Sequence, residues 1–278
     1  MLIGIPKEIK NHEYRVGMTP TSVQEAVAHG HSVVVQANAG IGIGSTDANY
    51  ESAGARIADT AEEIFAEADM IVKVKEPQSV ERKMLREDQI LFTYLHLAPD
   101  PEQTKDLVDS GAVCIAYETV VDGQGGLSLL APMSQVAGRM SIQAGAHCLE
   151  RAQGGKGILL GGVPGVAPAD VVIIGGGVVG ENAIYMALGM AAKVTVLDRN
   201  VDVLRNLTTR FGPALTTVYS TQAALEQYVL EADLVIGGVL VKGAEAPKLV
   251  TADMVREMST GSVLCDVAID QGGCFETS

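Results

Sequence analysis

A glycine-rich turn in the second half of the chain carries the strongest chemical signal in the sequence. It spaces Gly175, Gly177 and Gly180 as G-x-G-x-x-G, directly after the apolar stretch Val171–Ile174. In a dinucleotide site the first glycine makes a tight turn, the second lets the backbone approach a pyrophosphate, and the third lets the next helix pack closely on the strand. The amino end of that helix offers free N–H groups and a favourable dipole to phosphate. The turn therefore predicts a dinucleotide-binding site.

An acidic residue at the end of the next expected strand indicates which dinucleotide binds. Asp198 follows Val194–Leu197, where a carboxylate accepts hydrogen bonds from the adenosine ribose and repels a 2′-phosphate. This favours NAD over NADP, although the neighbouring Arg199 weakens the discrimination. The alternative is a purely structural glycine turn followed by an exposed acid.

The first half holds three side chains of the kinds that a dehydrogenase of a small acid needs: an anion clamp, a cation and a proton carrier. Arg15 lies in a charged loop after the first expected strand, and arginine can clamp a carboxylate through two parallel hydrogen bonds. Lys75 alternates with Lys73 along the apolar strand expected at Met70–Val74, so both lysines should share one face. For Arg15 the alternative is a solvated surface charge, and for Lys75 a structural role is equally open.

A histidine provides the candidate proton carrier. His96 directly follows the strand expected at Leu91–Leu95, and imidazole exchanges protons readily near neutral pH. A structural role for His96 stays open from these residues alone. The other four histidines lie in loops or along expected helices, where surface or packing roles are the better interpretation.

Two series of alternating strands and helices must position these residues. This alternation predicts an α/β fold of two Rossmann-like domains, each a mostly parallel sheet with helices on both faces. The expected domains are 1–128 for substrate and 129–278 for the dinucleotide, joined by a long helix at Pro132–Gln153 that opens the second domain. The expected strands are Leu2–Ile5, Ser32–Gln36, Met70–Val74, Leu91–Leu95 and Val113–Tyr117, then Val171–Ile174, Val194–Leu197, Thr216–Tyr219, Leu234–Ile236 and Ser262–Val267.

Composition excludes several other classes of protein. The net charge of −14 disfavours nucleic-acid and anionic-membrane partners. The four cysteines have no metal-ligand spacing, so we expect buried free thiols and no metal. The stretch Met1–Glu8 lacks the basic start and long apolar core of a signal peptide, and no apolar run approaches the roughly 20 residues that span a bilayer. The expectation is a cytoplasmic protein.

Seven stretches occur together in a specific order, and they run through essentially the whole chain. In that order the sequence resembles the alanine dehydrogenase family, which also includes the alpha component of pyridine nucleotide transhydrogenase. The stretches are Gly4–Glu8, Glu13–Val16, Val72–Pro77, Phe92–Ala98, Ala131–Ser134, Ile174–Gly180 and Asp266–Gly273.

The resemblance implies NAD-dependent oxidative deamination of L-alanine to pyruvate and ammonium, and the reverse reductive amination. It implies two domains around a cleft, with the amino acid held by the first and NAD by the second. Arg15 and Lys75 are then expected to bind the substrate carboxylate and to polarise its carbonyl or amine. His96 is expected to be the general acid/base, and Asp270 is expected to assist near the nicotinamide.

The resemblance also implies further cofactor contacts and an assembly. Ser134 is expected to reach a cofactor phosphate, while Ser220, Val239 and Leu240 are expected to line the adenosine side and the approach to the nicotinamide. The alternatives are helix capping for the two serines, loop packing for Val239 and Leu240, and a turn for Asp270. Family members form homo-oligomers, typically hexamers, so the same is expected here.

The sequence differs from the alanine dehydrogenase family at its carboxyl end. Members of the family continue beyond the Asp270 motif through a segment that returns to the first domain, so this sequence is expected to be C-terminally shortened at Ser278. Two other functions stay open, the first because it shares the two-domain plan and the second because of the missing end. The chain could be the nucleotide-binding component of an NAD(P) transhydrogenase, or a non-catalytic NAD-binding fragment.

Overall fold

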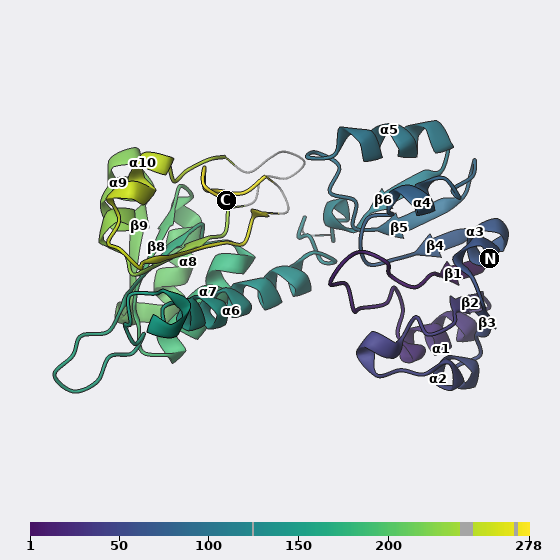
Figure 1. The fold of residues 1–278 in the computed structure, drawn as a ribbon, viewed down its shortest axis with the longest axis horizontal. Helices are drawn as coiled ribbons and strands as arrows, with labels where there is room; N and C mark the ends of the chain where they lie inside the picture. Colours follow the sequence, from purple (N-terminus) through teal and green to yellow (C-terminus); the bar gives the residue numbers. More distant parts are fainter. Residues whose placement is uncertain (124, 240–246, 270–271) are drawn as a thin grey trace. The chain divides into compact units, whose positions relative to one another are not determined.

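The chain folds into two compact units, seen in a computed structural model that describes residues 1–123, 125–239, 247–269 and 272–278. The first unit is Met1–Leu127 and the second is Ser128–Ser278, so the division lies one residue before the boundary expected from the sequence. Leu240 and Asp270, two of the candidate site residues, lie outside the described residues. Each unit is an α/β layer structure (Figure 1).

The first unit is built on a six-stranded parallel sheet in the order β3-β2-β1-β4-β5-β6. Its strands are β1 (Leu2–Ile5), β2 (Ser32–Gln36), β3 (Arg56–Ala58), β4 (Met70–Val72), β5 (Ile90–Thr93) and β6 (Val113–Ala116). Its helices are α1 (Pro20–Ala28), α2 (Asp47–Ser52), α3 (Ala61–Glu67), α4 (Ser79–Arg82) and α5 (Pro101–Ser110), with short 3-10 turns at Ile41–Ile43 and Tyr117–Thr119. β2 and β3 lie on one side of β1, and β4, β5 and β6 lie on the other side. The strand order therefore reverses at the boundary between β1 and β4.

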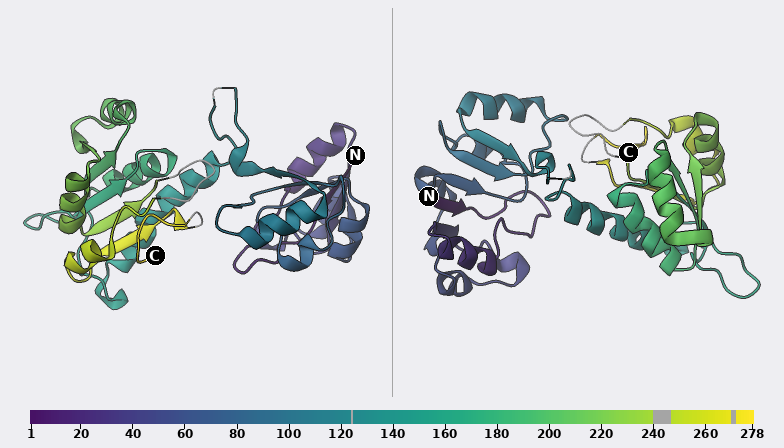
Figure 2. Two further views of the ribbon diagram at one scale, coloured as in Figure 1. Left: turned by 90° about the horizontal axis from the view of Figure 1, so that it is seen from above. Right: turned by 180° about the vertical axis from the view of Figure 1, so that it is seen from behind.

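Two buried clusters sandwich this sheet. On one face Val23 of α1 and Tyr50 of α2 pack against residues of β1 and β2. On the other face Ile64 and Phe65 of α3 pack with Leu107 of α5 against β4 and β5. The helices thus cover both faces of a buried parallel sheet, as the two further views also show (Figure 2).

The second unit repeats the plan on a five-stranded parallel sheet in the order β11-β10-β7-β8-β9. Its strands are β7 (Asp170–Ile174), β8 (Lys193–Asp198), β9 (Leu215–Tyr219), β10 (Leu234–Gly237) and β11 (Val263–Asp266). Its helices are α6 (Ala131–Cys148), α7 (Val178–Gly189), α8 (Val201–Phe211), α9 (Gln222–Glu231) and α10 (Ala252–Glu257), with 3-10 turns at Arg151–Gln153 and Gly212–Ala214.

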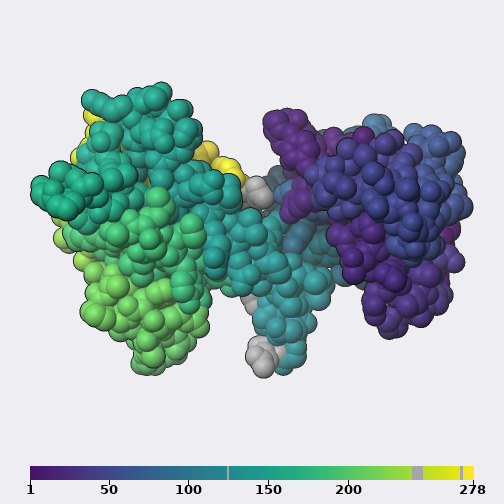
Figure 3. Space-filling view, turned by 90° about the horizontal axis from the view of Figure 1, so that it is seen from below, coloured from purple at the N-terminus to yellow at the C-terminus, as the bar shows by residue number. Residues whose placement is uncertain are grey.

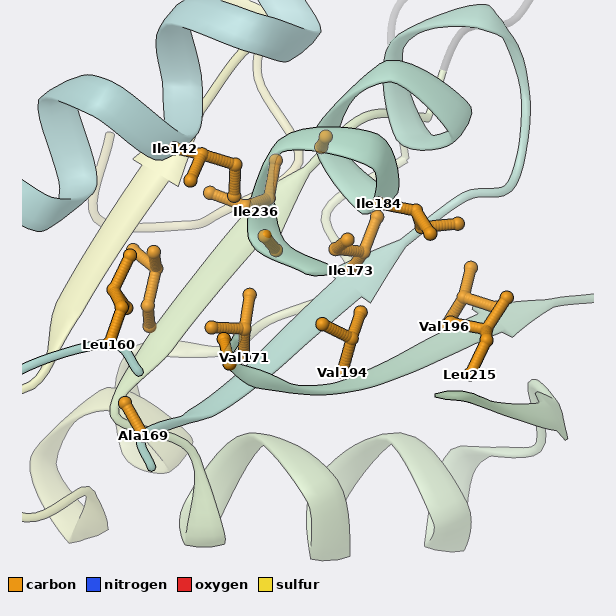
Figure 4. Close-up of a cluster of buried hydrophobic side chains, with 14 of the residues drawn as sticks. Ile142, Leu160, Ala169, Val171, Ile173, Ile184, Val194, Val196, Leu215 and Ile236 are labelled. Atoms are coloured by element: carbon orange, nitrogen blue, oxygen red, sulfur yellow. The ribbon is translucent and has the colours of Figure 1, made fainter. Parts of the chain in front are cut away.

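The central strands of this sheet are buried on both sides. Val171 and Ile173 face one cluster with Ile142 of α6 and Ile184 of α7 (Figure 4). The alternate residues Val172 and Ile174 face a second cluster that includes residues of α9 and α10. Burial of alternate residues on both faces explains why β7 is apolar at every position after Asp170.

Helix α6 packs closely on the amino-terminal half of α7 through a glycine. A Cβ atom on Gly138 would lie 2.2 Å from the carbonyl oxygen of Val179, so only glycine permits this approach. One position along, the Nε of Arg139 donates to the Oδ1 of Asn182 over 3.0 Å. The middle of α6 is thereby fixed beside the start of α7.

The structure shortens several expected elements. The strand expected over Met70–Val74 ends at Val72, although its backbone pairing continues for a few residues, with Lys73 N–H donating to Phe92 and Tyr94 N–H to Val74. The long helix ends at Cys148 rather than Gln153, and a separate 3-10 turn follows. The short strand β3 and the single-turn helix α4 were not predicted, because three or four residues carry no readable periodicity.

An extended loop projects from the second unit between the 3-10 turn and β7 (Figures 1 and 3). Its tip closes through a two-way backbone bridge between Val163 and Val166. Leu159, Val163 and Val166 are 53–61% exposed. This loop therefore presents apolar side chains to solvent.

The four cysteines, all among the described residues, are free thiols. Only Cys274 is fully buried, and Cys148 is exposed, so the expectation of buried thiols was wrong for Cys148. Within the described ranges, no helix is both long enough and apolar enough to cross a membrane.

Candidate functional site

The glycine turn of the second unit adopts the tight geometry that its spacing predicts. Gly175 leaves β7 with a φ of +96°, in the region that favours glycine, and its N–H donates to the carbonyl of Leu197 on β8. A Cβ on Gly180 would lie 1.9 Å from the carbonyl oxygen of Gly175. The third glycine therefore lets α7 press directly against the turn.

The start of α7 has the open surroundings that a phosphate needs. Gly177 is its N-cap residue, and no side chain of the described residues caps it. No described atom lies within 4 Å of a Cβ built on Gly177. The first N–H groups of a 12-residue helix are thus left for another acceptor. These observations fit the pyrophosphate of a dinucleotide.

Asp198 lies where the sequence predicts the ribose-binding acid, at the carboxyl end of β8. Its Oδ2 accepts from the N–H of Gly176 over 2.7 Å, and its Oδ1 accepts from the N–H of Asn200 over 2.7 Å. Each carboxylate oxygen keeps a further lone pair for a hydroxyl group. Asp198 therefore ties the glycine turn to β8 and remains half-exposed.

Three other candidates also belong to the second unit. The N–H of Ser220 donates to the Asp198 carbonyl over 3.0 Å, and the helix after it is capped by Thr221, so Ser220 is not the cap. The side chain of Val239 approaches Gly175, with its Cγ2 3.1 Å from a Cβ built there. Ser134 lies within α6, one helical turn before Gly138. Capping of α6 by Ser134 is excluded by this position.

In the first unit the candidates gather where β1, β4 and β5 end. These neighbouring parallel strands flank the point at which the strand order reverses, the usual ligand position in open α/β sheets. The loop that carries Arg15 is held there by Gly17, whose Cβ would lie 2.3 Å from the carbonyl oxygen of Val72. The hydroxyl of Thr93 donates to the carbonyl of Lys75 over 2.9 Å and links the ends of β4 and β5.

Arg15 is already engaged by a carboxylate of its own loop. Its Nε and terminal nitrogen donate to the two oxygens of Glu13 over 2.8 and 2.6 Å, which is the bidentate geometry expected toward a substrate. These hydrogen bonds to Glu13 raise the pKa of Arg15. Burial acts to raise the pKa of Glu13, but hydrogen bonds from Arg15 and the charge of Lys75 outweigh it, so this pKa lies below its usual value.

Lys73 and Lys75, which the sequence predicted to share one strand face, differ in their surroundings. Lys73 is fully buried, and its Nζ lies 3.1 Å from Glu8 and 2.8 Å from Glu81. The other oxygen of Glu8 accepts from the N–H of Val74 over 2.7 Å. Burial raises the pKa of Glu8, against the opposing charge of Lys73. Lys73 thus belongs to a buried network of ion pairs. Lys75, by contrast, is only half-buried and interacts electrostatically with Glu13.

The histidine is set in an unusual backbone conformation. His96 has a φ of +50°, and its ring stacks on Tyr94 with centroids 5.9 Å apart and an interplanar angle of 10°. Its backbone N–H donates to Glu118 over 2.6 Å. Burial raises the pKa of Tyr94, while the charge of Arg15 opposes this. Tyr94 is thereby linked to both His96 and Arg15, and Glu13 links Arg15 to Lys75.

The structure thus brings Arg15, Lys75 and His96 into one region of the first unit through two residues that the sequence reasoning missed, Glu13 and Tyr94. A third missed residue, Glu118, comes from the 3-10 turn after β6. Both Glu13 and Tyr94 lie in sequence stretches that resemble the alanine dehydrogenase family, and this resemblance was the signal that could have identified them. No comparable signal marked Glu118, because its partners are backbone groups more than 20 positions away.

The strand orders and the glycine turn define the class of protein: two Rossmann-like units, of which the second has a glycine turn with the spacing typical of dinucleotide-binding proteins. Residues 4–137 match the family described as "Alanine dehydrogenase/PNT, N-terminal domain", and residues 141–278 match its "C-terminal domain". The chain belongs to this family.

Similar proteins share this assignment. The whole chain aligns with the alanine dehydrogenase of Halomonas elongata at 61% identity and with that of Bacillus subtilis at 52%, covering 75% and 73% of those proteins. A solved L-alanine dehydrogenase superposes with a TM-score of 0.91 at 53% identity, and the chain covers 76% of it. The chain therefore spans about three quarters of the length of these relatives.

Two other solved structures resemble this chain less closely. A transhydrogenase from Sinorhizobium meliloti superposes with a TM-score of 0.83 at 27% identity. A dipicolinate synthase chain from Bacillus halodurans does so with a TM-score of 0.56 at 11% identity, which shows a common fold alone. The transhydrogenase likeness is weaker than the likeness to alanine dehydrogenases in both identity and superposition.

Proposed function

We propose that this chain catalyses the reversible reaction L-alanine + NAD⁺ + H₂O ⇌ pyruvate + NH₄⁺ + NADH + H⁺. Relatives named alanine dehydrogenase, at 52–61% identity over the whole chain, support this reaction. The set of cationic, imidazole and tyrosine side chains at the ends of β4 and β5 supports an anionic substrate of small size.

The second unit binds NAD in this proposal. The uncapped start of α7 and Gly177 receive the pyrophosphate, and Ser134 on the adjoining helix contacts a phosphate. Asp198 accepts hydrogen bonds from the adenosine ribose, with Ser220 beside it. Val239 and Leu240 line the approach to the nicotinamide, and Asp270 assists there. When bound, NAD accepts a hydride from the substrate Cα.

The first unit holds the amino acid and manages its protons. Arg15 binds the substrate carboxylate, and its bidentate contact with the carboxylate of Glu13 supports this role. Lys75 stabilises negative charge on the substrate oxygen. His96 accepts a proton from the water that attacks the imine carbon and returns a proton as ammonia leaves.

The single observation that carries this proposal is the linked set Lys75, Glu13, Arg15, Tyr94 and His96, because it unites an anion clamp with a stacked imidazole. The test is alanine-dependent reduction of NAD, followed at the absorbance band of reduced nicotinamide. His96→Ala should lose at least about 100-fold in kcat, the usual size of a lost general acid/base, and keep NAD affinity near that of the wild type. Loss of NAD binding in this variant would count against the role of His96.

The family likeness leaves one rival enzyme, a transhydrogenase that moves hydride between two nicotinamides. Hydride transfer from NADH to an NADP analogue without alanine-dependent turnover would favour that function. Binding of NAD with no turnover of either kind would instead favour a non-catalytic NAD-binding fragment. Affinity for NADP equal to that for NAD would overturn the assignment of NAD as the cofactor.

We further propose that the protein acts in the cytoplasm as a homo-oligomer, a hexamer as is typical of the family. The exposed apolar side chains of the loop at residues 156–168 support an association surface, because monomeric proteins rarely leave such groups clustered in solvent. Sedimentation of the purified chain measures the number of subunits directly.

A further inference from the structure

The segment that carries His96 is held by polar contacts on two sides. The N–H of Leu95 lies 3.1 and 3.2 Å from the two oxygens of Glu118, and the N–H of His96 lies 2.6 Å from one of them. On the other side, the buried amide of Gln103 donates to the carbonyl of Leu95 over 2.6 Å. One carboxylate therefore accepts from two successive backbone N–H groups.

The conformation that these contacts hold is uncommon for residues other than glycine. A φ of +50° places His96 in the left-handed region, where a side chain with a Cβ is disfavoured and needs support from its surroundings. Successive N–H groups in such a turn converge on a common acceptor and make a binding place for negative charge. Here the anion is the side chain of Glu118 rather than a ligand.

The ring of His96 is held by an aromatic contact. The imidazole lies nearly parallel to the Tyr94 ring at a centroid distance of 5.9 Å. Tyr94 is in turn held edge-on by Tyr117, with centroids 4.9 Å apart. Tyr117 and Glu118 are neighbours in the same 3-10 turn, so this turn supports the histidine through an aromatic contact and a carboxylate together.

We propose that Glu118 is a positioning residue for the reaction: its carboxylate clamps the N–H groups of Leu95 and His96 and so holds the imidazole at the angle required for proton transfer. This inference rests on the proposed function only in naming proton transfer as the step that the clamp serves. Glu118 has no contact with substrate in this assignment and acts through His96 alone.

Two variants test the clamp by removing it in stages. Glu118→Gln keeps one acceptor oxygen but loses the charge, and Glu118→Ala removes both acceptors. We expect kcat to fall by about 10- to 100-fold in Glu118→Ala, the cost of a misplaced catalytic group, with Glu118→Gln in between. KM for alanine should stay within about threefold of the wild type, because Arg15 and Lys75 are unaltered. Glu102→Gln, at an 81% exposed side chain of the same unit, is the matched control.

A double-mutant cycle separates positioning from a general loss of structure. If Glu118 acts only through His96, Glu118→Ala should cause no further loss of kcat in a His96→Ala background. Equal losses in both backgrounds would overturn the proposal, as would full activity in Glu118→Ala.

A spectroscopic measurement tests the clamp and does not depend on enzymatic turnover. In protein labelled with nitrogen-15 at its histidines, the short bond to Glu118 should place the His96 amide proton far downfield, and Glu118→Gln should move it upfield. An unmoved resonance would overturn the clamp even if Glu118→Ala failed to fold. If the wild-type chain showed no alanine-dependent NADH formation, the proposed function would fail, while the amide shift would still decide whether the clamp exists.

Discussion

At the scale of single residues, two glycines of α7 show how the position of a residue constrains the glycine turn after β7. Gly180 touches the Gly175 carbonyl so closely that no side chain fits, whereas a Cβ placed on Gly189, at the other end of α7, would have no described atom within 4 Å. The same residue type is therefore obligatory at one end of α7 and dispensable at the other.

This contrast yields a matched pair of variants. Gly180→Ala should destabilise the second unit by about 1–3 kcal/mol or more through overpacking and should weaken NAD binding. Gly189→Ala should leave NAD binding unchanged and stabilise the fold by up to about 1 kcal/mol. Denaturant unfolding and calorimetric titration with NAD measure both effects. Equal NAD affinity in the two variants would contradict the role given to the turn.

The cysteines give a prediction about pH. Burial raises the pKa of the Cys274 thiol to about 11 and also raises the pKa of Cys114 and Cys265. Because only the thiolate reacts, these three thiols should react slowly near pH ~8 and faster as the pH rises toward their pKa values. The exposed Cys148 should react first with a thiol reagent in the native protein. Labelling followed by peptide mapping identifies the order, and early modification of Cys274 would contradict it.

Several site residues were predictable from sequence because their positions follow from strand ends. Asp198 ends β8, and His96 follows the last residue of β5 by three positions. Both strands have a readable apolar pattern, and within each sheet parallel strands bring their carboxyl ends to one edge. The bidentate partner of Arg15 was not predictable, since the contact between Glu13 and Arg15 depends on how an irregular loop folds. The hydrogen bonds from the N–H groups of Leu95 and His96 to Glu118 were not predictable for the same reason.

At the scale of secondary-structure elements, the end of β4 shows where strand periodicity fails. The alternation of Lys73 and Lys75 suggested two lysines on one face, but the strand ends at Val72 and the two side chains take different roles. Lys73 joins Glu8 after β1 and Glu81 in α4 into one buried ion network. Through the Val74 N–H, this network fixes the segment that presents Lys75.

Breaking this network should unfold the first unit more easily. Lys73→Met leaves two buried carboxylates without their cation and should cost about 3–5 kcal/mol in the free energy of unfolding. Adding Glu8→Gln and Glu81→Gln should recover most of that loss, because the buried charges are then gone. Lys105→Met, at a fully exposed lysine of α5, should have almost no effect. A Lys73→Met variant as stable as the wild type would refute the structural role.

At the scale of the whole molecule, the order of strands and helices was largely predictable from the sequence. The ends of these elements, and the short elements β3 and α4, were less predictable. Runs of three to six residues separated by amphipathic helices predicted ten of the eleven described strands, and the glycine turn after β7 has the tight geometry that its spacing predicts. The relatives confirm the family across the full chain. The roles of Asp270 and Leu240 stay predictions, since both residues lie outside the described ranges.

The most direct test of the proposed reaction follows one hydrogen atom. The purified chain is incubated with NAD and with L-alanine deuterated at Cα, and the reduced cofactor is analysed by mass spectrometry. If the chain is an alanine dehydrogenase, the deuterium moves to the nicotinamide ring and pyruvate accumulates in equal amount. Absence of reduced cofactor, or reduced cofactor without deuterium, would contradict the proposed hydride transfer from the alanine Cα.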